Sequence, residues 1–361
     1  MIRKGICAFL GIFMFISVGC RNNFNSNENT EDFKKSVESI YFNNEFAMSI
    51  ADKYMLAFKD GDLNTIKSLS TEEIDENIII KPNGDVTVTG IKEEGVSQMG
   101  GKAMFKYEVT RAKEGEPKAY LEEYYLEVNK TPEEEYKVSM FKSVSKYNIF
   151  KEKEKLKIRK DDDVEINTLI ELKNIPDRAY PKVNVIDIAK VDVPKDDFSA
   201  LGLSFTGDKV AISTYSGNNS YIGVVDIEDS EATTAEEGQD EGEKNKGEDN
   251  GKTVGKKIVN LDIIEGAKIK SLNFSDDDGY VVVNYDKDNA RRFKVYQSNG
   301  DIVALELDDI FSEASYNLVY EKIKDNNIVM EVTPLAGSTG IDTALTGKYK
   351  ISLKDFKLQK L

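Results

Sequence analysis

From Lys182 to the C-terminus, the sequence is a succession of short apolar or alternating segments separated by turn-forming residues. Such segments have the length and pattern of strands, and twelve of them predict an all-β domain over residues 182–361. The expected strands are 183–193, 200–206, 209–215, 220–227, 256–263, 269–275, 279–286, 291–298, 301–308, 315–323, 327–335 and 347–353.

An internal similarity indicates how these strands are grouped. Leu203-Ser-Phe-Thr-Gly-Asp208 before Val210–Ile212 resembles Leu272-Asn-Phe-Ser-Asp276 before Tyr280–Val283, 69 residues further on. Without an acidic insertion of 29 residues between the copies, the interval is 40, close to the period of a four-stranded propeller blade. The pattern is similar to the repeats of extracytoplasmic propellers, although both copies lack the proline. Three blades are fewer than the usual number that closes, so a partial propeller, a meander and a sandwich stay open.

The insertion covers residues 229–257. Between Glu228 and Gly251 it holds ten acidic and two basic residues and almost nothing apolar. Such a segment cannot bury enough apolar surface to fold, so we expect it to be disordered.

The N-terminus has the pattern of an export signal. Arg3 and Lys4 precede an apolar run of about 15 residues, shorter than the roughly 20 that a transmembrane helix needs. The run and the residues Val18, Gly19 and Cys20 resemble the signal peptide and lipobox of bacterial lipoproteins, with Ser17 at the usual leucine position. The resemblance implies a signal peptide over residues 1–19, recognition of Val18 and Gly19 by the signal peptidase, and lipidation of Cys20. An uncleaved membrane anchor is the alternative.

Composition bears on location and partners. Residues 20–43 are rich in Asn, Ser and Glu and are expected to be a flexible tether to the membrane. The formal net charge of −16 disfavours nucleic acid as a partner because both are negatively charged. We therefore expect a lipid-anchored protein on the extracytoplasmic face of the cell membrane, with envelope proteins or a small ligand as partners. The abundance of Lys, Ile and Asn suggests a Gram-positive source.

Residues 44–150 begin with helical periodicity and continue with strands. Phe46, Ile50, Tyr54 and Phe58 recur every four residues, and Asp60-Gly61-Asp62 separates this helix from a second, shorter one. A strand hairpin is expected around Pro82–Asp85, followed by the strands 103–111, 118–130 and 135–147. The order of elements and the segment Ala51–Leu63 resemble an NTF2-like domain. That resemblance implies an α+β cone, a fold shared by enzymes and non-catalytic modules.

Between the two expected domains, residues 151–181 alternate basic and acidic side chains and contain Pro176 and Pro181. Strings of alternating charge are typical of solvated segments. We interpret this range as a charged connector.

Catalytic and metal chemistry is restricted by composition. The chain has no His, and its two Cys are Cys7 and Cys20, so imidazole bases and His/Cys zinc sites are excluded. Oxygen ligands for Ca²⁺ are available at Asp276, Asp278, Asp286 and Asp288, although the second half of a binding loop is missing. We expect no cofactor, no other metal and no catalytic residue.

Three functions remain open from the sequence. The first and favoured one is a non-catalytic binding or interaction module at the cell envelope. The second is a carbohydrate or cell-wall polymer binder, suggested by 17 Tyr and 17 Phe in a β-rich chain, which would display aromatic rings in an exposed row. The third is a hydrolase that uses carboxylates alone, which needs two converging carboxyl groups.

Overall fold

The computed structural model describes residues 42–71, 86–160, 165–182, 189–227 and 252–361. Asn43–Leu361 is one compact unit. The expected signal peptide, Val18, Gly19, Cys20 and nearly all of the expected tether lie outside the described residues. None of the helices in the described ranges is long and apolar enough to cross a membrane.

Two capped helices open the compact unit, as the sequence predicts. Helix α2 (Asn44–Asp60) begins after Asn43, whose side chain accepts a hydrogen bond from the amide of Phe46, and ends at Gly61 in the left-handed conformation. Helix α3 (Leu63–Leu69) begins after Asp62, which accepts from the amide of Thr65. Because both ends of α2 are capped locally, its position in the chain is set by the sequence.

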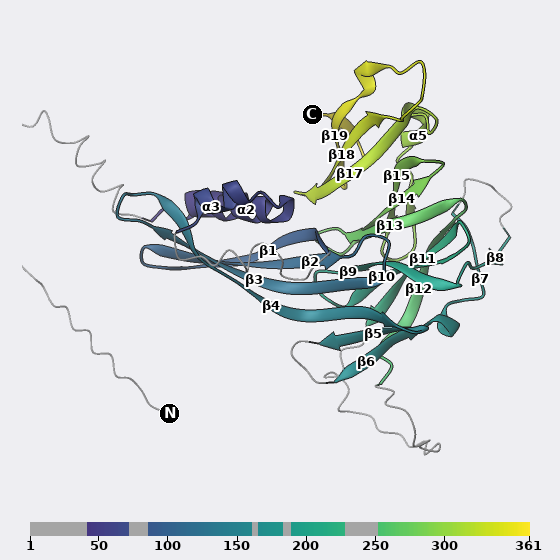
Figure 1. Ribbon diagram of the computed structural model, residues 1–361, viewed down its shortest axis with the longest axis horizontal. Coiled ribbons are helices and arrows are strands. Elements are labelled where there is room, and N and C mark those ends of the chain that lie inside the picture. The colour runs from purple at the N-terminus through teal and green to yellow at the C-terminus, as the bar shows by residue number, and fades with distance from the viewer. Residues whose placement is uncertain (1–41, 72–85, 161–164, 183–188, 228–251) are drawn as a thin grey trace, which may run out of the picture. The chain divides into compact units, whose positions relative to one another are not determined.

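A six-stranded antiparallel sheet follows, with its strands in sequence order. These are β1 (Thr87–Met99), β2 (Lys102–Ala112), β3 (Lys118–Lys130), β4 (Tyr136–Glu152), β5 (Lys155–Lys160) and β6 (Ile166–Glu171). Helix α2 packs against β1 to β4, as Figure 1 shows. The rings of Tyr54 and Phe58 on α2 contact Tyr124 and Phe141, with centroid distances of 5.1 to 5.2 Å.

The predicted α+β cone over residues 44–150 is wrong. Apart from α2, α3, the short α5 (Leu307–Ile310) and two 3-10 turns (Leu172–Asn174 and Thr343–Leu345), the regular elements of the described residues are strands in five antiparallel sheets. The first sheet does not end near residue 150 but continues to β6, and the aromatic rings fill the space that a cone would leave open. Residues 151–181, expected to be a connector, thus contain β5 and β6.

Three four-stranded antiparallel meanders make up most of the second half, where the all-β expectation fits. The first has β9 (Asp197–Leu203), β10 (Lys209–Ser216), β11 (Asn219–Ile227) and β12 (Gly255–Ile264). The second has β13 (Ala267–Phe274), β14 (Tyr280–Lys287), β15 (Ala290–Gln297) and β16 (Ile302–Val303). The third has β17 (Tyr316–Lys324), β18 (Asn327–Pro334), β19 (Gly347–Ser352) and β20 (Leu358–Lys360), and a separate pair is formed by β7 (Arg178–Ala179) and β8 (Val191–Asp192).

The strand positions differ from expectation at a few places. The expected strand 301–308 is the two-residue β16 followed by α5, and β20 is not apparent in the sequence pattern. Most of the expected strand 183–193 and of the acidic insertion 229–257 lies outside the described residues. The last part of that insertion is ordered, because Thr168 and Val254 exchange backbone hydrogen bonds with each other and with Lys252, and β12 begins at Gly255.

The first sheet and the first meander share one hydrophobic core. Leu121, Ile149 and Leu156 of the sheet belong to the same buried cluster as Leu201 and Val210 of the meander. Strands β9 and β13 then join the first meander to the second, and β15 and β17 join the second to the third. The buried apolar side chains therefore cross the boundary expected near residue 180.

The internal similarity corresponds to two equivalent turns, but in a different register. Ser204 Oγ accepts from the amide of Lys209, and Ser275 Oγ accepts from the amide of Tyr280, in both cases where the meander's first strand turns into its second. The equivalent positions are therefore 71 residues apart, rather than the 69 that aligning Leu203 with Leu272 predicts. A shift of two residues preserves the side-chain faces of a strand, so the pattern alone does not reveal it.

Candidate functional site

The four aspartates proposed as calcium ligands are not brought together. Asp276 and Asp278 precede β14, whereas Asp286 and Asp288 lie at its other end. A strand of 8 residues is about 25 Å long, too far for one cation to be shared. Among the described residues, no group of three or more Asp, Glu, Cys or His side chains is suited to holding a metal ion.

Asp278 has a structural partner set instead. Its carboxylate is buried and accepts hydrogen bonds from the amides of Phe205 at 2.8 Å and Thr206 at 2.9 Å, and from the Thr206 hydroxyl at 2.8 Å. The two equivalent turns are thus tied together by one side chain. Its lone pairs are directed at protein groups and not at a ligand site.

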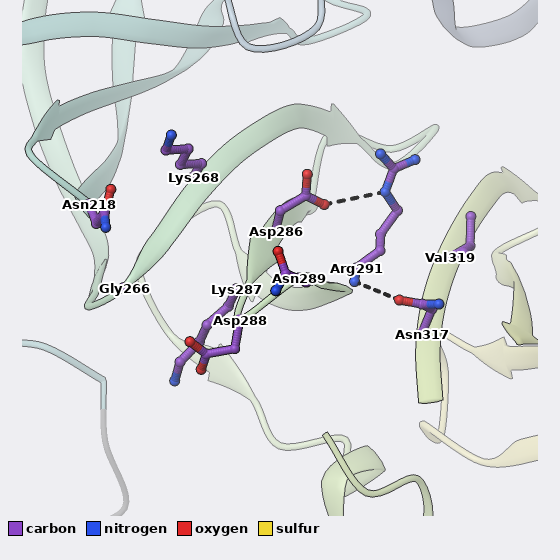
Figure 2. Close-up of a pocket in the computed structure, with 10 residues that line it drawn as sticks. All are labelled: Asn218, Gly266, Lys268, Asp286, Lys287, Asp288, Asn289, Arg291, Asn317 and Val319. Atoms are coloured by element: carbon purple, nitrogen blue, oxygen red, sulfur yellow. Dashed lines mark hydrogen bonds and ion pairs between the residues drawn. The ribbon is translucent and has the colours of Figure 1, made fainter. Parts of the chain in front are cut away.

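Asp286 and Asp288 line a polar pocket of about 790 Å³, drawn in Figure 2. Asp286 Oδ1 lies 3.4 Å from Arg291 Nε, and the amide of Arg291 donates to Asn317 Oδ1 at 3.0 Å. The other lining residues are Asn218, Gly266, Lys268, Lys287, Asn289 and Val319. No aromatic ring lines this pocket, and ligand sites usually combine apolar walls with a few polar groups.

The carboxylates of the first sheet are paired with cations. Glu108 lies 2.8 Å from Lys146 Nζ, and Glu127 lies 2.7 Å from Lys102 Nζ. Glu122 lies 3.5 Å from buried Arg111 and accepts the Tyr124 hydroxyl at 2.9 Å. Each of these groups therefore has a stabilising role that requires no substrate.

A second pocket, of about 500 Å³, combines apolar walls with charged side chains. We call it the amphipathic pocket. It is lined by α2, β1 and β2, by the turn after β9, by the end of β13, and by β17 with its hairpin turn. Its apolar and aromatic lining consists of Met55, Leu56, Ile91, Tyr107, Phe205, Phe274, Tyr320 and Ile323. Its charged lining consists of Asp52, Lys53, Lys59, Lys92, Glu93, Asp276, Lys322, Lys324 and Asp325.

The floor of the amphipathic pocket depends on a close approach between two segments. Phe205 is buried, and its ring packs directly on Gly90 of β1. A Cβ atom at residue 90 would lie 2.6 Å from Phe205 Cζ, so only glycine leaves room for the ring. Beside this floor, Leu56 of α2 is 41% exposed, which leaves apolar surface open to a ligand.

The charges of the amphipathic pocket perturb one another. Burial and the neighbouring Asp52 raise the pKa of the Glu93 carboxyl, and burial followed by the charges of Asp52 and Glu93 raises the pKa of Tyr107. Burial and the nearby Lys322 lower the pKa of Lys59. Groups whose charged forms are disfavoured in a cavity are candidates for ligand contacts.

The sequence contains a partial signal for this pocket. Asp52, Leu56 and Lys59 lie at helical spacing on one face of α2, a face that the search for buried periodicity does not select. The contributions of Phe205, Phe274 and β17 come from positions about 150 to 270 residues away in the chain. Their juxtaposition has no local signal.

Exposed aromatic rings do not form the row expected of a polymer binder. Among the described residues, the most exposed rings are those of Phe46 on α2, Tyr180 after β7, and Tyr215 on β10. Most of the remaining rings are buried in the cores. This distribution does not favour carbohydrate binding by stacking.

Comparisons with known proteins add little. Neither a protein-family model nor a curated protein matches the chain. Prolyl oligopeptidase B from Galerina marginata is 10% identical, with a TM-score of 0.24, over 78% of this chain and 42% of that one. Kluyveromyces lactis Hsv2p is 11% identical, with a TM-score of 0.22, over 76% of this chain and 97% of that one.

A puromycin-hydrolyzing peptidase of Mycobacterium tuberculosis is 7% identical, with a TM-score of 0.21, over 75% of this chain and 53% of that one. The chain thus spans less than half of the oligopeptidase and about half of the mycobacterial peptidase. Likenesses with TM-scores this low carry no argument about fold, activity or substrate.

Proposed function

We propose that this chain is a lipid-anchored, extracytoplasmic protein that binds a small ligand in the amphipathic pocket without catalysing a reaction. The observation that carries the proposal is the pocket itself, in which half-exposed apolar side chains lie beside charged ones. A ligand seated there would contact α2, β1 and the third meander at once. The export signal and Cys20 support the location.

The anchor is tested by changing its single attachment point. We expect the wild-type protein, expressed in its host, to fractionate with membranes and to carry a diacylglycerol adduct on Cys20 by mass spectrometry. Cys20→Ala removes the thiol that accepts the lipid, so this variant should be recovered unlipidated and away from the membrane pellet. A wild-type chain that is soluble and cut elsewhere would contradict the proposed location.

The pocket is tested with Nile red, an uncharged apolar dye whose fluorescence rises in apolar surroundings. Leu56→Ser removes apolar wall from the pocket, and the loss of about 1.5 kcal/mol of buried surface should weaken dye binding about tenfold. Val144→Ser is the matched control, because Val144 is also half-exposed but lies on β4, outside the pocket. Equal dye binding by wild type and Leu56→Ser would contradict the pocket as the binding site.

A carboxylate hydrolase is kept as a second candidate by one observation. Asp52 and Glu93 lie in the same pocket, the pKa of Glu93 is raised by burial and by Asp52, and the Tyr107 hydroxyl donates to Asp52 at 3.2 Å. Glycosidases use two carboxyl groups with separated pKa values. Glu93 is nonetheless exposed, whereas such acids are enclosed. Turnover of an oligosaccharide by wild type but not by Glu93→Gln would favour this candidate.

A further inference from the structure

The amphipathic pocket has opposite charges at the two ends of its α2 wall. Asp52, Leu56 and Lys59 follow one another along the same face of the helix. Seven residues of helix separate Asp52 from Lys59, which corresponds to about 10 Å along the axis. A ligand lying along this wall would meet an acidic group, an apolar surface and a basic group in that order.

The acidic end contains two carboxylates and no compensating cation. Glu93 of β1 lies near Asp52, and each disfavours the charge of the other. Among the described residues neither makes an ion pair, and the hydrogen bond from Tyr107 is directed at one oxygen of Asp52. A cationic group of a ligand would relieve this repulsion.

The basic end contains two lysines in a similar position. Lys322 of β17 lies near Lys59 and disfavours its charge. The Lys59 ammonium donates to the carbonyl of Glu321 at 3.4 Å, while the carboxylate of Glu321 lies 2.7 Å from Lys348. In the described ranges, neither Lys59 nor Lys322 has a carboxylate within 4 Å, although Asp60 and Glu321 act on Lys59 from further away. An anionic group of a ligand would be stabilised here.

The remaining charges of the pocket alternate in sign. Asp276 and Asp325 lie near each other, but Lys92 offsets the charge of Asp276 and Lys324 precedes Asp325 in the hairpin. Lys92 itself lies 3.0 Å from Glu94 and over the ring of Phe205. This part of the wall therefore has less unbalanced charge than the two ends.

We propose that the amphipathic pocket binds a short apolar peptide with free termini, its amine between Asp52 and Glu93 and its carboxylate between Lys59 and Lys322. An extended chain spans about 3.3 to 3.6 Å per residue, so three residues cover about 10 Å. The apolar side chains of the peptide would rest on Leu56 and Phe205. This inference rests on the proposed function, because it assigns the ligand class of the same pocket.

The test uses the tripeptide Ala-Leu-Ala in four forms: unmodified, acetylated at the amine, amidated at the carboxylate, and blocked at both ends. Binding to the purified full-length chain is measured by isothermal titration calorimetry. Each block removes one charge that contacts a partly buried pair, so each should weaken binding about tenfold. Mass spectrometry of the recovered peptide should show it intact.

Two variants assign the ends. Asp52→Asn should bind the unmodified and acetylated peptides about equally and still discriminate against the amide. Lys322→Gln should show the reverse pattern. Lys268→Gln, a lysine of the polar pocket, is the control and should discriminate like the wild type. Thermal unfolding of each variant shows that the fold is retained.

The outcomes separate this inference from the proposed function. If Nile red binds as expected but the four peptides bind equally or not at all, the peptide is excluded and the pocket stands as a binding site. If amidation alone weakens binding, the ligand is an amphipathic anion and the inference is overturned. If Leu56→Ser also leaves dye binding unchanged, the proposed function fails as well.

Discussion

Gly202→Ala is expected to destabilise the protein by about 3 kcal/mol or more. Gly202 lies in β9, where an added Cβ would stand 2.1 Å from the carbonyl oxygen of Leu272 in β13 and 2.8 Å from its carbonyl carbon. These are backbone atoms of a buried strand, which cannot turn aside as a side chain does. The methyl group would force apart the two strands through which the first and second meanders are joined.

The measurement is urea unfolding followed by circular dichroism, with a midpoint well below that of the wild type. Gly95→Ala is the matched control, because Gly95 is also a strand glycine, but nothing lies within 4 Å of its added Cβ. Its stability should change by less than about 0.5 kcal/mol. A wild-type midpoint for Gly202→Ala would show that β9 and β13 do not approach as closely as the structure has them.

The strands of the second half could be predicted because their signals are local. Alternating apolar residues and turn residues mark β10, β14 and β18, and two-residue turns such as Asp288-Asn289, with both residues in the left-handed region, close the hairpins. How the meanders pack depends on close approaches such as that of Gly202 to Leu272. A glycine within a strand hints at such an approach without naming the partner.

The first half shows where local patterns mislead. The helices and β2 to β4 lie close to their expected positions, yet the fold class was wrong because it depends on how far the sheet extends. Lys155–Lys160 looks like a charged connector, although Leu156 and Ile158 alternate with basic residues and are buried in β5. In β1, register shifts at Val88/Gly90 and Glu93/Gly95 interrupt the alternation, so the strand has no clear period.

The candidate site could be predicted only in part. The charges and Leu56 on one face of α2 are visible in the sequence, but the partners Glu93 and Lys322 come from strands that reach the helix through tertiary packing. The aspartates singled out as calcium ligands show the opposite case. Their clustering in the sequence reflects turns at the two ends of β14, as the hydrogen bonds of Asp278 and the hairpin residue Asp288 make clear.

Asp278→Asn is expected to lower the free energy of unfolding by about 2 kcal/mol. Asparagine has nearly the same shape and tolerates the left-handed backbone at this position, where φ is 55°. It lacks the charge, and its NH₂ group would face either the amide of Phe205 or that of Thr206, both of which are donors. One buried amide would therefore lose its acceptor.

Asp288→Asn is the control for this change, because Asp288 has a similar φ of 50° but is exposed, and its stability should change by less than about 0.5 kcal/mol. Urea unfolding compares the two variants. Asp278 also holds the backbone of Phe205, whose ring forms the floor of the amphipathic pocket. Asp278→Asn should therefore weaken Nile red binding at urea concentrations where the variant is still folded, whereas Asp288→Asn should not. Unchanged stability and unchanged dye binding in Asp278→Asn would mean that this carboxylate does not position the pocket floor.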